Sequence, residues 1–191
     1  MTTNHSQETA LTNDMCMKSR GAVRGLMASA AIVVLLGCPQ TASSQEARPN
    51  DPLLDALTGQ WVLRGEIRGA PTTHDVDVSW VLNHRFLRLH ERSRETTQEG
   101  EPQYEADVYI GWDSAGDRYI VRWMDVYGGG FSLTGYGLRN GSAIPFVFAS
   151  GENGFRTTFA FDDGAGLWNV TMDSEHGGQL RPFARLSMTR R

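Results

Sequence analysis

Apolar and polar residues alternate along most of the chain beyond residue 59, in runs of seven to ten residues. In one run the residues on one face are apolar and alternate with Glu105, Asp107, Tyr109 and Gly111; they are Tyr104, Ala106, Val108, Ile110 and Trp112. A period of two is typical of β-strands with one face against a core and the other in water. The pattern predicts ten strands, over 60–68, 73–80, 85–95, 103–112, 118–125, 130–138, 143–149, 154–161, 167–173 and 179–189.

The links between the predicted strands are short and rich in turn residues. Asn140-Gly141 and Asn153-Gly154 suit tight hairpins, because both central residues of such a turn can take a positive φ. No stretch beyond residue 59 keeps a helical period for a dozen residues, as parallel crossovers would require. The sequence therefore predicts an all-β fold, a single antiparallel up-and-down barrel, since ten strands in an open sheet would leave two sticky edges.

A short helix is expected just before the first strand. Asp51 offers an N-cap oxygen, Pro52 suits the first helical position and Gly59 suits the C-terminal end. Leu53 and Leu57 give this segment an apolar face. One or two turns fit between these signals.

The N-terminal region has the character of an export signal. Basic residues from Lys18 onward precede an apolar run over 26–36, which is too short to span a membrane as a helix. The end of the run resembles the lipobox of a bacterial lipoprotein signal, which Leu35, Gly37 and Cys38 match and Leu36 does not. We expect a signal peptide over 1–37, a lipidated Cys38 with a linker over 38–50, and the barrel domain over 51–191.

Two alternatives to lipidation stay open, namely a signal cut after Ser44, which yields a soluble form, and an uncleaved anchor. The polar stretch before Met17 lacks signal character, so translation from Met17 is an alternative start that would remove Cys16. The favoured location is the bacterial cell envelope, with the domain facing the periplasm on a lipid anchor. Two acyl chains would hold it there stably.

Composition and charge narrow the function classes. The chain has 191 residues, 40% hydrophobic and 21% charged, which is ordinary for one globular domain. Its formal net charge is −4, without a basic block, so nucleic acid is not an expected partner. Protein partners and oligomeric state are not indicated.

Four short motifs resemble known families. The start of the predicted barrel is similar to the Gly-x-Trp of lipocalins and other calycins. In order and spacing, the set as a whole resembles the bacterial family called domain of unknown function 1579. The motifs are Leu57-x-Gly59-x-Trp61, Trp80-x-Leu82-x-x-Arg85-Phe86-Leu87, Gly111-Trp112-Asp113 with Gly116 and Tyr119, and Trp123-x-Asp125.

The resemblance implies a lipocalin-like barrel without an established activity. In calycins the Trp plugs the closed end of the barrel and an Arg near the end of the chain lies across it. The resemblance thus implies a structural plug of Trp61 with either Arg185 or Arg190.

Signatures of catalysis and metal binding are weak, and we expect no catalytic residue, metal or cofactor. The segment Gly130-Phe131-Ser132 lacks the second Gly of a nucleophile elbow. His84 and His90 lie too far apart along a strand to chelate one ion. The segment 173–176, with Asp173, Glu175 and His176, could hold a divalent ion, but a solvated hairpin loop is the favoured interpretation.

Two positions on the second and third strands are ambiguous. His74 shares its face with Val76, Val78 and Trp80 and is predicted to point inward, either as an ordinary rim histidine, which is favoured, or as a ligand to haem. On the third strand we expect Leu87 and Leu89 to face the core. Arg88, Arg92 and their neighbours would then form an outer stripe paired with Glu91, Glu95 and residues across the sheet. The reversed register would place arginines inside, where they would select an anionic head group.

The favoured function is binding of a small apolar molecule inside the barrel, because barrels of more than about eight strands have more interior than their side chains fill. A mobile lip is expected at Gly128–Gly130. The alternative is a barrel filled by its own aromatics that acts as a structural or interaction lipoprotein, and an enzyme is less favoured than either. The predicted ligand-binding residues are Trp80, Trp112, Trp123, Phe146, Phe159 and His74.

Overall fold

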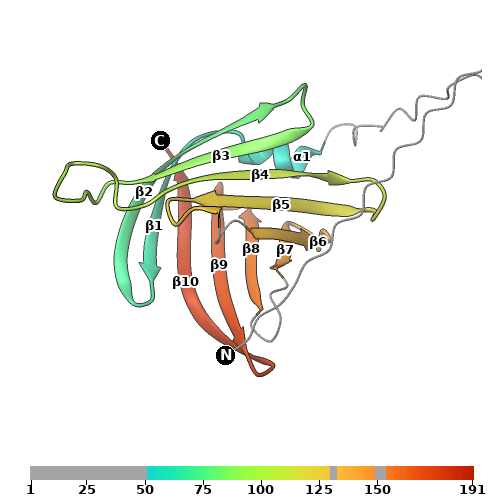
Figure 1. The fold of residues 1–191 in the computed structure, drawn as a ribbon. Coiled ribbons are helices and arrows are strands. Elements are labelled where there is room, and N and C mark those ends of the chain that lie inside the picture. The colour runs from blue at the N-terminus through green and yellow to red at the C-terminus, as the bar shows by residue number, and fades with distance from the viewer. Residues whose placement is uncertain (1–50, 130–132, 149–153) are drawn as a thin grey trace, which may run out of the picture. The chain divides into compact units, whose positions relative to one another are not determined.

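The computed structural model describes residues 51–129, 133–148 and 154–191. The predicted signal peptide, Cys38, Ser132 and Asn153 lie outside the described residues. The rest of the predicted domain forms a closed barrel of ten antiparallel strands with one short helix (Figure 1). The predicted fold class is confirmed.

Each strand pairs with its neighbours in sequence, and β1 closes the barrel by pairing with β10. The elements are α1 (Pro52–Leu57), β1 (Gly59–Ile67), β2 (Ala70–Val81), β3 (Phe86–Ser93), β4 (Glu105–Asp113), β5 (Arg118–Asp125), β6 (Leu133–Gly137), β7 (Ala143–Phe148), β8 (Phe155–Asp162), β9 (Leu167–His176) and β10 (Gln179–Arg190).

The helix begins where the sequence predicts. Asp51 accepts hydrogen bonds from the backbone N–H groups of Leu53 and Leu54 at 3.1 and 3.5 Å, so it is the N-cap. Leu53, Leu54 and Leu57 are buried in the barrel core. The helix therefore closes one end of the barrel with its apolar face.

Two hairpins are tighter than the alternation predicts. Arg68 and Gly69 form a two-residue turn with φ of 53° and 79°, and β2 consequently begins at Ala70, opposite Ile67. Gly177 and Gly178 form a similar turn, so β9 continues to His176 and residues 173–176 belong to a strand. The expected loop over 173–176 was wrong, because the two glycines alone make the turn.

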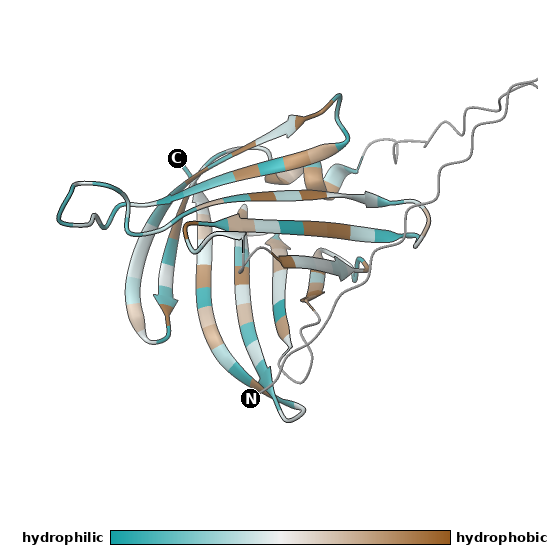
Figure 2. Ribbon diagram, viewed as in Figure 1, coloured by the Kyte–Doolittle hydropathy of each residue, from teal (hydrophilic) through white to brown (hydrophobic). Residues whose placement is uncertain are grey.

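The third strand has the favoured register. Leu87 and Leu89 are buried, and Arg92 and Arg94 are exposed. Arg88 pairs with Asp107 and Arg94 with Asp75 on the outer surface. One part of the expectation was wrong: Glu91 does not pair with the outer arginines but lies on the inner face, with 9% of its surface exposed. Figure 2 shows the alternation of apolar and polar residues along the strands.

Large side chains fill the end of the barrel beside α1. Trp61, Tyr119, Phe146 and Trp168 are all buried there or just above, and Trp61 donates a hydrogen bond from Nε1 to the Leu57 carbonyl at 2.7 Å. This packed half leaves room for a ligand only toward the other end. No helix within the described ranges is long and apolar enough to cross a membrane.

Candidate functional site

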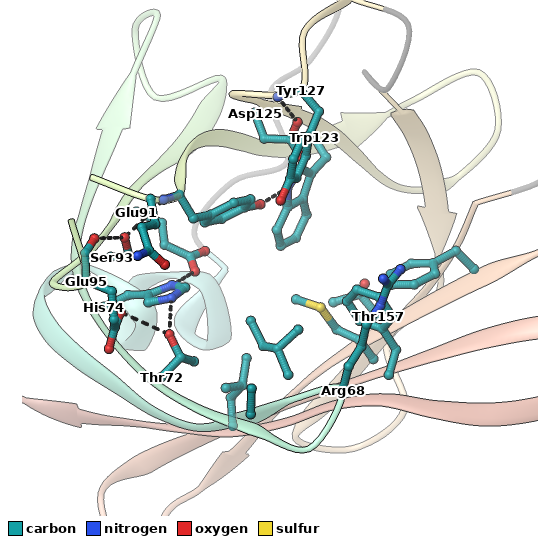
Figure 3. Close-up of a pocket in the computed structure, with 18 of the residues that line it drawn as sticks. Arg68, Thr72, His74, Glu91, Ser93, Glu95, Trp123, Asp125, Tyr127 and Thr157 are labelled. Atoms are coloured by element: carbon teal, nitrogen blue, oxygen red, sulfur yellow. Dashed lines mark hydrogen bonds and ion pairs between the residues drawn. The ribbon is translucent and has the colours of Figure 1, made fainter. Parts of the chain in front are cut away.

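A cavity of about 760 Å³ occupies the end of the barrel away from α1. Its mouth lies beside the exposed β1–β2 turn and Tyr127, whose side chain is 65% exposed. Most of the wall is apolar, and a polar cluster occupies one side (Figure 3). The main apolar residues are Ile67, Phe148, Phe155, Met172, Phe183 and Leu186, and the polar cluster consists of Thr72, His74, Glu91, Ser93 and Glu95.

The polar cluster comes from the ends of β2 and β3. The inner row of β3 runs from Leu87 and Leu89 beside the packed core to Glu91 and Ser93 beside the cavity. Because side chains of one strand alternate between faces, Glu91 had to follow Leu89 to the inside once the register was set. The alternation along β3 is therefore enough to identify Glu91 as an inner, site-facing residue, although we expected it on the outer surface.

His74 is the centre of this cluster and is 2% exposed. Its Nδ1 hydrogen-bonds to the carboxylate of Glu91, and its Nε2 lies 2.7 Å from the hydroxyl of Thr72. Both ring nitrogens therefore have protein partners. The sequence left open the alternative that His74 ligates a haem iron. Its Nε2 would first have to lose the contact with the Thr72 hydroxyl.

Glu95 completes the cluster from the segment after β3. Its two carboxylate oxygens accept hydrogen bonds from the Thr73 backbone N–H at 3.0 Å and from the Thr72 hydroxyl at 3.2 Å. Partial burial by itself raises the pKa of Glu95, but these hydrogen bonds and the nearby His74 outweigh burial and leave the pKa below its usual value of 4.5. Glu95 is thus held as an anion.

Aromatic side chains continue the wall beyond His74. The Tyr104 ring stacks on the His74 ring at 5.7 Å, and its hydroxyl accepts a hydrogen bond from Trp123 Nε1 at 2.9 Å. Tyr127 lies tilted against Tyr104 at 6.3 Å. Burial, and then the charge of Glu91, raises the pKa of Tyr104, so its hydroxyl keeps its proton. The sequence analysis placed Tyr104 on an inner face but did not identify it as a site residue.

Thr157 and Arg68 lie away from the polar cluster (Figure 3). Thr157 is 1% exposed, and within the part of the chain that the structure describes its hydroxyl has no hydrogen-bond partner. Arg68, at the β1–β2 turn, lies with its guanidinium carbon 4.9 Å from the centre of the Phe183 ring. Neither residue was predicted.

The six predicted ligand-binding residues divide into three groups. His74 and Trp123 line the cavity. Phe159 borders only a void of about 10 Å³, too small for a ligand. Trp80, Trp112 and Phe146 line neither of these two spaces.

The excluded residues pack at other heights along the barrel. Trp80 donates from Nε1 to an Asp55 carboxylate oxygen at 2.8 Å, which ties it to α1. Trp112 packs edge-on against Tyr119 at 5.1 Å. The period of two assigns a residue to the inner face but does not give its height along the barrel, which depends on strand tilt and register.

Of the two arginines that were candidates for the aromatic plug, one lies over Trp61. The guanidinium carbon of Arg190 lies 4.4 Å from the centre of the Trp61 ring. Arg185 instead pairs with the Asp173 carboxylate and donates to the Met172 carbonyl at 2.8 Å. The structure therefore places Arg190, and not Arg185, across Trp61.

The other sequence candidates do not add to the site. Among the residues described, no group of three or more His, Cys, Asp or Glu side chains could hold a metal ion, and Asp173 of the suggested site is paired with Arg185. At the expected lip, Asp125 and Tyr127 line the cavity, and Gly128 follows with a φ of 82°. Gly130 lies outside the described residues.

Comparisons with known proteins support the fold alone. No protein-family model and no curated protein matches the chain. A solved structure that is similar is the crystal structure of Rv2717c from M. tuberculosis, with 15% identity and a TM-score of 0.50, over 74% of this chain and 98% of that one. The resemblance to domain of unknown function 1579 stays a prediction.

Proposed function

We propose that this barrel binds a small, mostly apolar molecule in the cavity at its open end. The observation that carries the proposal is the cavity itself, whose volume of about 760 Å³ lies within the range typical of ligand sites. A mainly apolar wall with a few convergent polar groups is also typical of such sites. The ligand would enter beside the β1–β2 turn and Tyr127.

The alternative of a self-filled barrel has less support. Aromatic side chains fill the half of the barrel beside α1, as that alternative expects. The other half is not filled, although Phe148, Phe155 and Phe183 border it and could have packed across it. Phe155 instead packs edge-on against Phe183 along the wall, with ring centres 5.1 Å apart.

One arrangement favours a second candidate, an esterase-like activity. Thr72, His74 and Glu91 stand in the order hydroxyl, imidazole and carboxylate that activates a nucleophile. The Thr72 hydroxyl also donates to Glu95, which competes for the proton that His74 would have to accept. We therefore rank binding above catalysis. Hydrolysis of p-nitrophenyl esters that Thr72→Val abolishes would reverse that order.

Binding can be tested with the neutral fluorescent probe N-phenyl-1-naphthylamine. We expect one saturable site and quenching of Trp123, which alone of the five tryptophans lines the cavity. Leu186→Trp should fill the cavity and abolish binding, whereas Val147→Trp, at a position that is 44% exposed, should not. If Leu186→Trp does not fold, Met172→Trp replaces it. A barrel that binds neither this probe nor any molecule seen by native mass spectrometry would contradict the proposal.

We also propose that the protein is exported and anchored by a lipid at Cys38. The support is in the sequence: basic residues, an apolar run over 26–36 and a partial lipobox. The barrel would then face the periplasm and sample apolar molecules near the membrane surface.

A further inference from the structure

We infer that the ligand of this cavity is an amphipathic cation, with an apolar body and an ammonium group beside Glu91, Asp125 and Tyr104. The inference rests on the proposed function and names the chemical class of the ligand. It is carried by the charges in the cavity wall and by the aromatic rings next to them.

Two carboxylates in the cavity wall have an oxygen that is available to a ligand. Glu91 accepts from His74 at Oε1, and within the described residues Oε2 accepts no hydrogen bond. Asp125 accepts from the Tyr127 backbone N–H at Oδ1, 3.0 Å away. Besides burial, the negative charges of Glu91 and Asp125 both raise the pKa of Tyr104, so both carboxylates act on the space around its hydroxyl.

Positive charge in the wall only partly offsets these anions, because His74, which bonds to Glu91, also lies beside Glu95. Among the described lining residues, Arg68 is the one Arg or Lys, and its guanidinium stacks on Phe183. It lies away from Glu91 (Figure 3). A charge buried without an opposite charge is unfavourable, and a ligand cation would supply what the wall lacks.

Aromatic rings stand next to the two carboxylates. Tyr104, Trp123 and Tyr127 all line the cavity, and the Trp123 N–H to Tyr104 hydroxyl hydrogen bond fixes two of them. Ring faces attract ammonium groups, and recognition of quaternary ammonium is the best-known use of such aromatic sites. The combination of carboxylates with rings favours a cation over a neutral polar head.

The test uses the full chain and three amphiphiles with the same tail: dodecyltrimethylammonium, dodecanol and dodecanoate. The two ionic compounds are used below their critical micelle concentrations and dodecanol below its solubility limit. Displacement of N-phenyl-1-naphthylamine gives their affinities. We expect the ammonium compound to bind about tenfold more tightly than the other two, and added salt to reduce this preference.

Variants locate the cation. Asp125→Asn and Glu91→Gln should each weaken binding of the ammonium compound and leave binding of dodecanol unchanged. The matched control is Asp163→Asn, which removes one charge from an exposed turn between β8 and β9 and should change neither. Should Glu91→Gln fail to fold, Asp125→Asn decides alone, since Asp125 lies at the rim.

The outcomes separate this inference from the proposed function. Equal binding of all three amphiphiles, or tighter binding of dodecanoate, would overturn the inference and leave a ligand-binding barrel. A preference for the cation that survives both variants would also overturn it, because the site would then lie elsewhere. If no bound N-phenyl-1-naphthylamine that can be displaced is detected, both this inference and the proposed function are overturned.

Discussion

Arg190 covers Trp61 and binds the helix that precedes it. Its guanidinium lies over the indole, and its two terminal nitrogens donate to the carbonyls of Thr58 at 2.9 Å and Ala56 at 3.3 Å. These carbonyls belong to the C-terminal end of α1, where carbonyls lack partners within the helix. One side chain from the last strand thus joins the helix, the first strand and the aromatic plug.

Replacing Arg190 should therefore destabilise the barrel. Arg190→Met keeps an apolar stem over Trp61 but removes the charge and both hydrogen bonds. We expect a loss of about 1–3 kcal/mol in the free energy of unfolding, measured by urea titration. The control is Arg185→Met, whose partner Asp173 lies on the outer surface, and which should change stability by less than about 1 kcal/mol. Equal effects of the two variants would contradict a special role for Arg190.

Asp51 should contribute to stability in two ways. It caps α1, and it accepts a hydrogen bond from the buried hydroxyl of Tyr119 on β5. Asp51→Ala removes the cap and leaves that hydroxyl without this partner, so we expect a loss of about 2 kcal/mol or more in thermal or urea unfolding. Tyr119→Phe removes only the second contact. In the double variant the losses should fall short of the sum, and full additivity would show that the two groups do not interact.

Glu95 should make stability depend on pH in the acidic range. Because its pKa is lower in the folded protein than its usual 4.5, its contribution is complete above pH 4.5 and is lost as pH falls through the lower, folded-state value. Urea unfolding from pH 7 to pH 3 should show Glu95→Gln less stable than wild type at neutral pH, with the difference vanishing in acid. Glu99→Gln, in the exposed loop before β4, should give no such trend.

Cys38→Ser tests the lipid anchor. Wild-type protein should fractionate with membranes, and the variant should become soluble or accumulate as precursor, because a serine hydroxyl cannot form the thioether. Cys16→Ser is the matched control and should change nothing, since this cysteine lies before the basic residues and apolar run of the signal and is removed with them. Soluble wild-type protein that begins at Gln45 would contradict lipidation and favour the simple signal cut.

Most of the fold, but only part of the candidate site, could be predicted from local sequence. All ten strands could be predicted, because the alternation of apolar and polar residues and the turn residues are both local signals, visible within a few neighbouring positions. For β5 the predicted bounds are the observed ones, Arg118–Asp125. The β1–β2 turn was missed because Arg68 takes a positive φ that arginine seldom adopts. Whether an inner residue meets the cavity depends on its height along the barrel. Trp80 and His74 share one face of one strand, yet Trp80 bonds to α1 and His74 lines the cavity.

Removal of the Thr157 hydroxyl should stabilise the barrel. Thr157→Val keeps the shape and replaces a buried hydroxyl that lacks a partner in the described structure with a methyl group. The free protein should gain about 1 kcal/mol in urea unfolding, because an unsatisfied polar group no longer has to be buried. Thr158→Val, the next residue on β8 and on its outer face, should not show this gain. A Thr157→Val protein that is less stable than wild type would contradict the prediction, because it would show that the hydroxyl already has a partner.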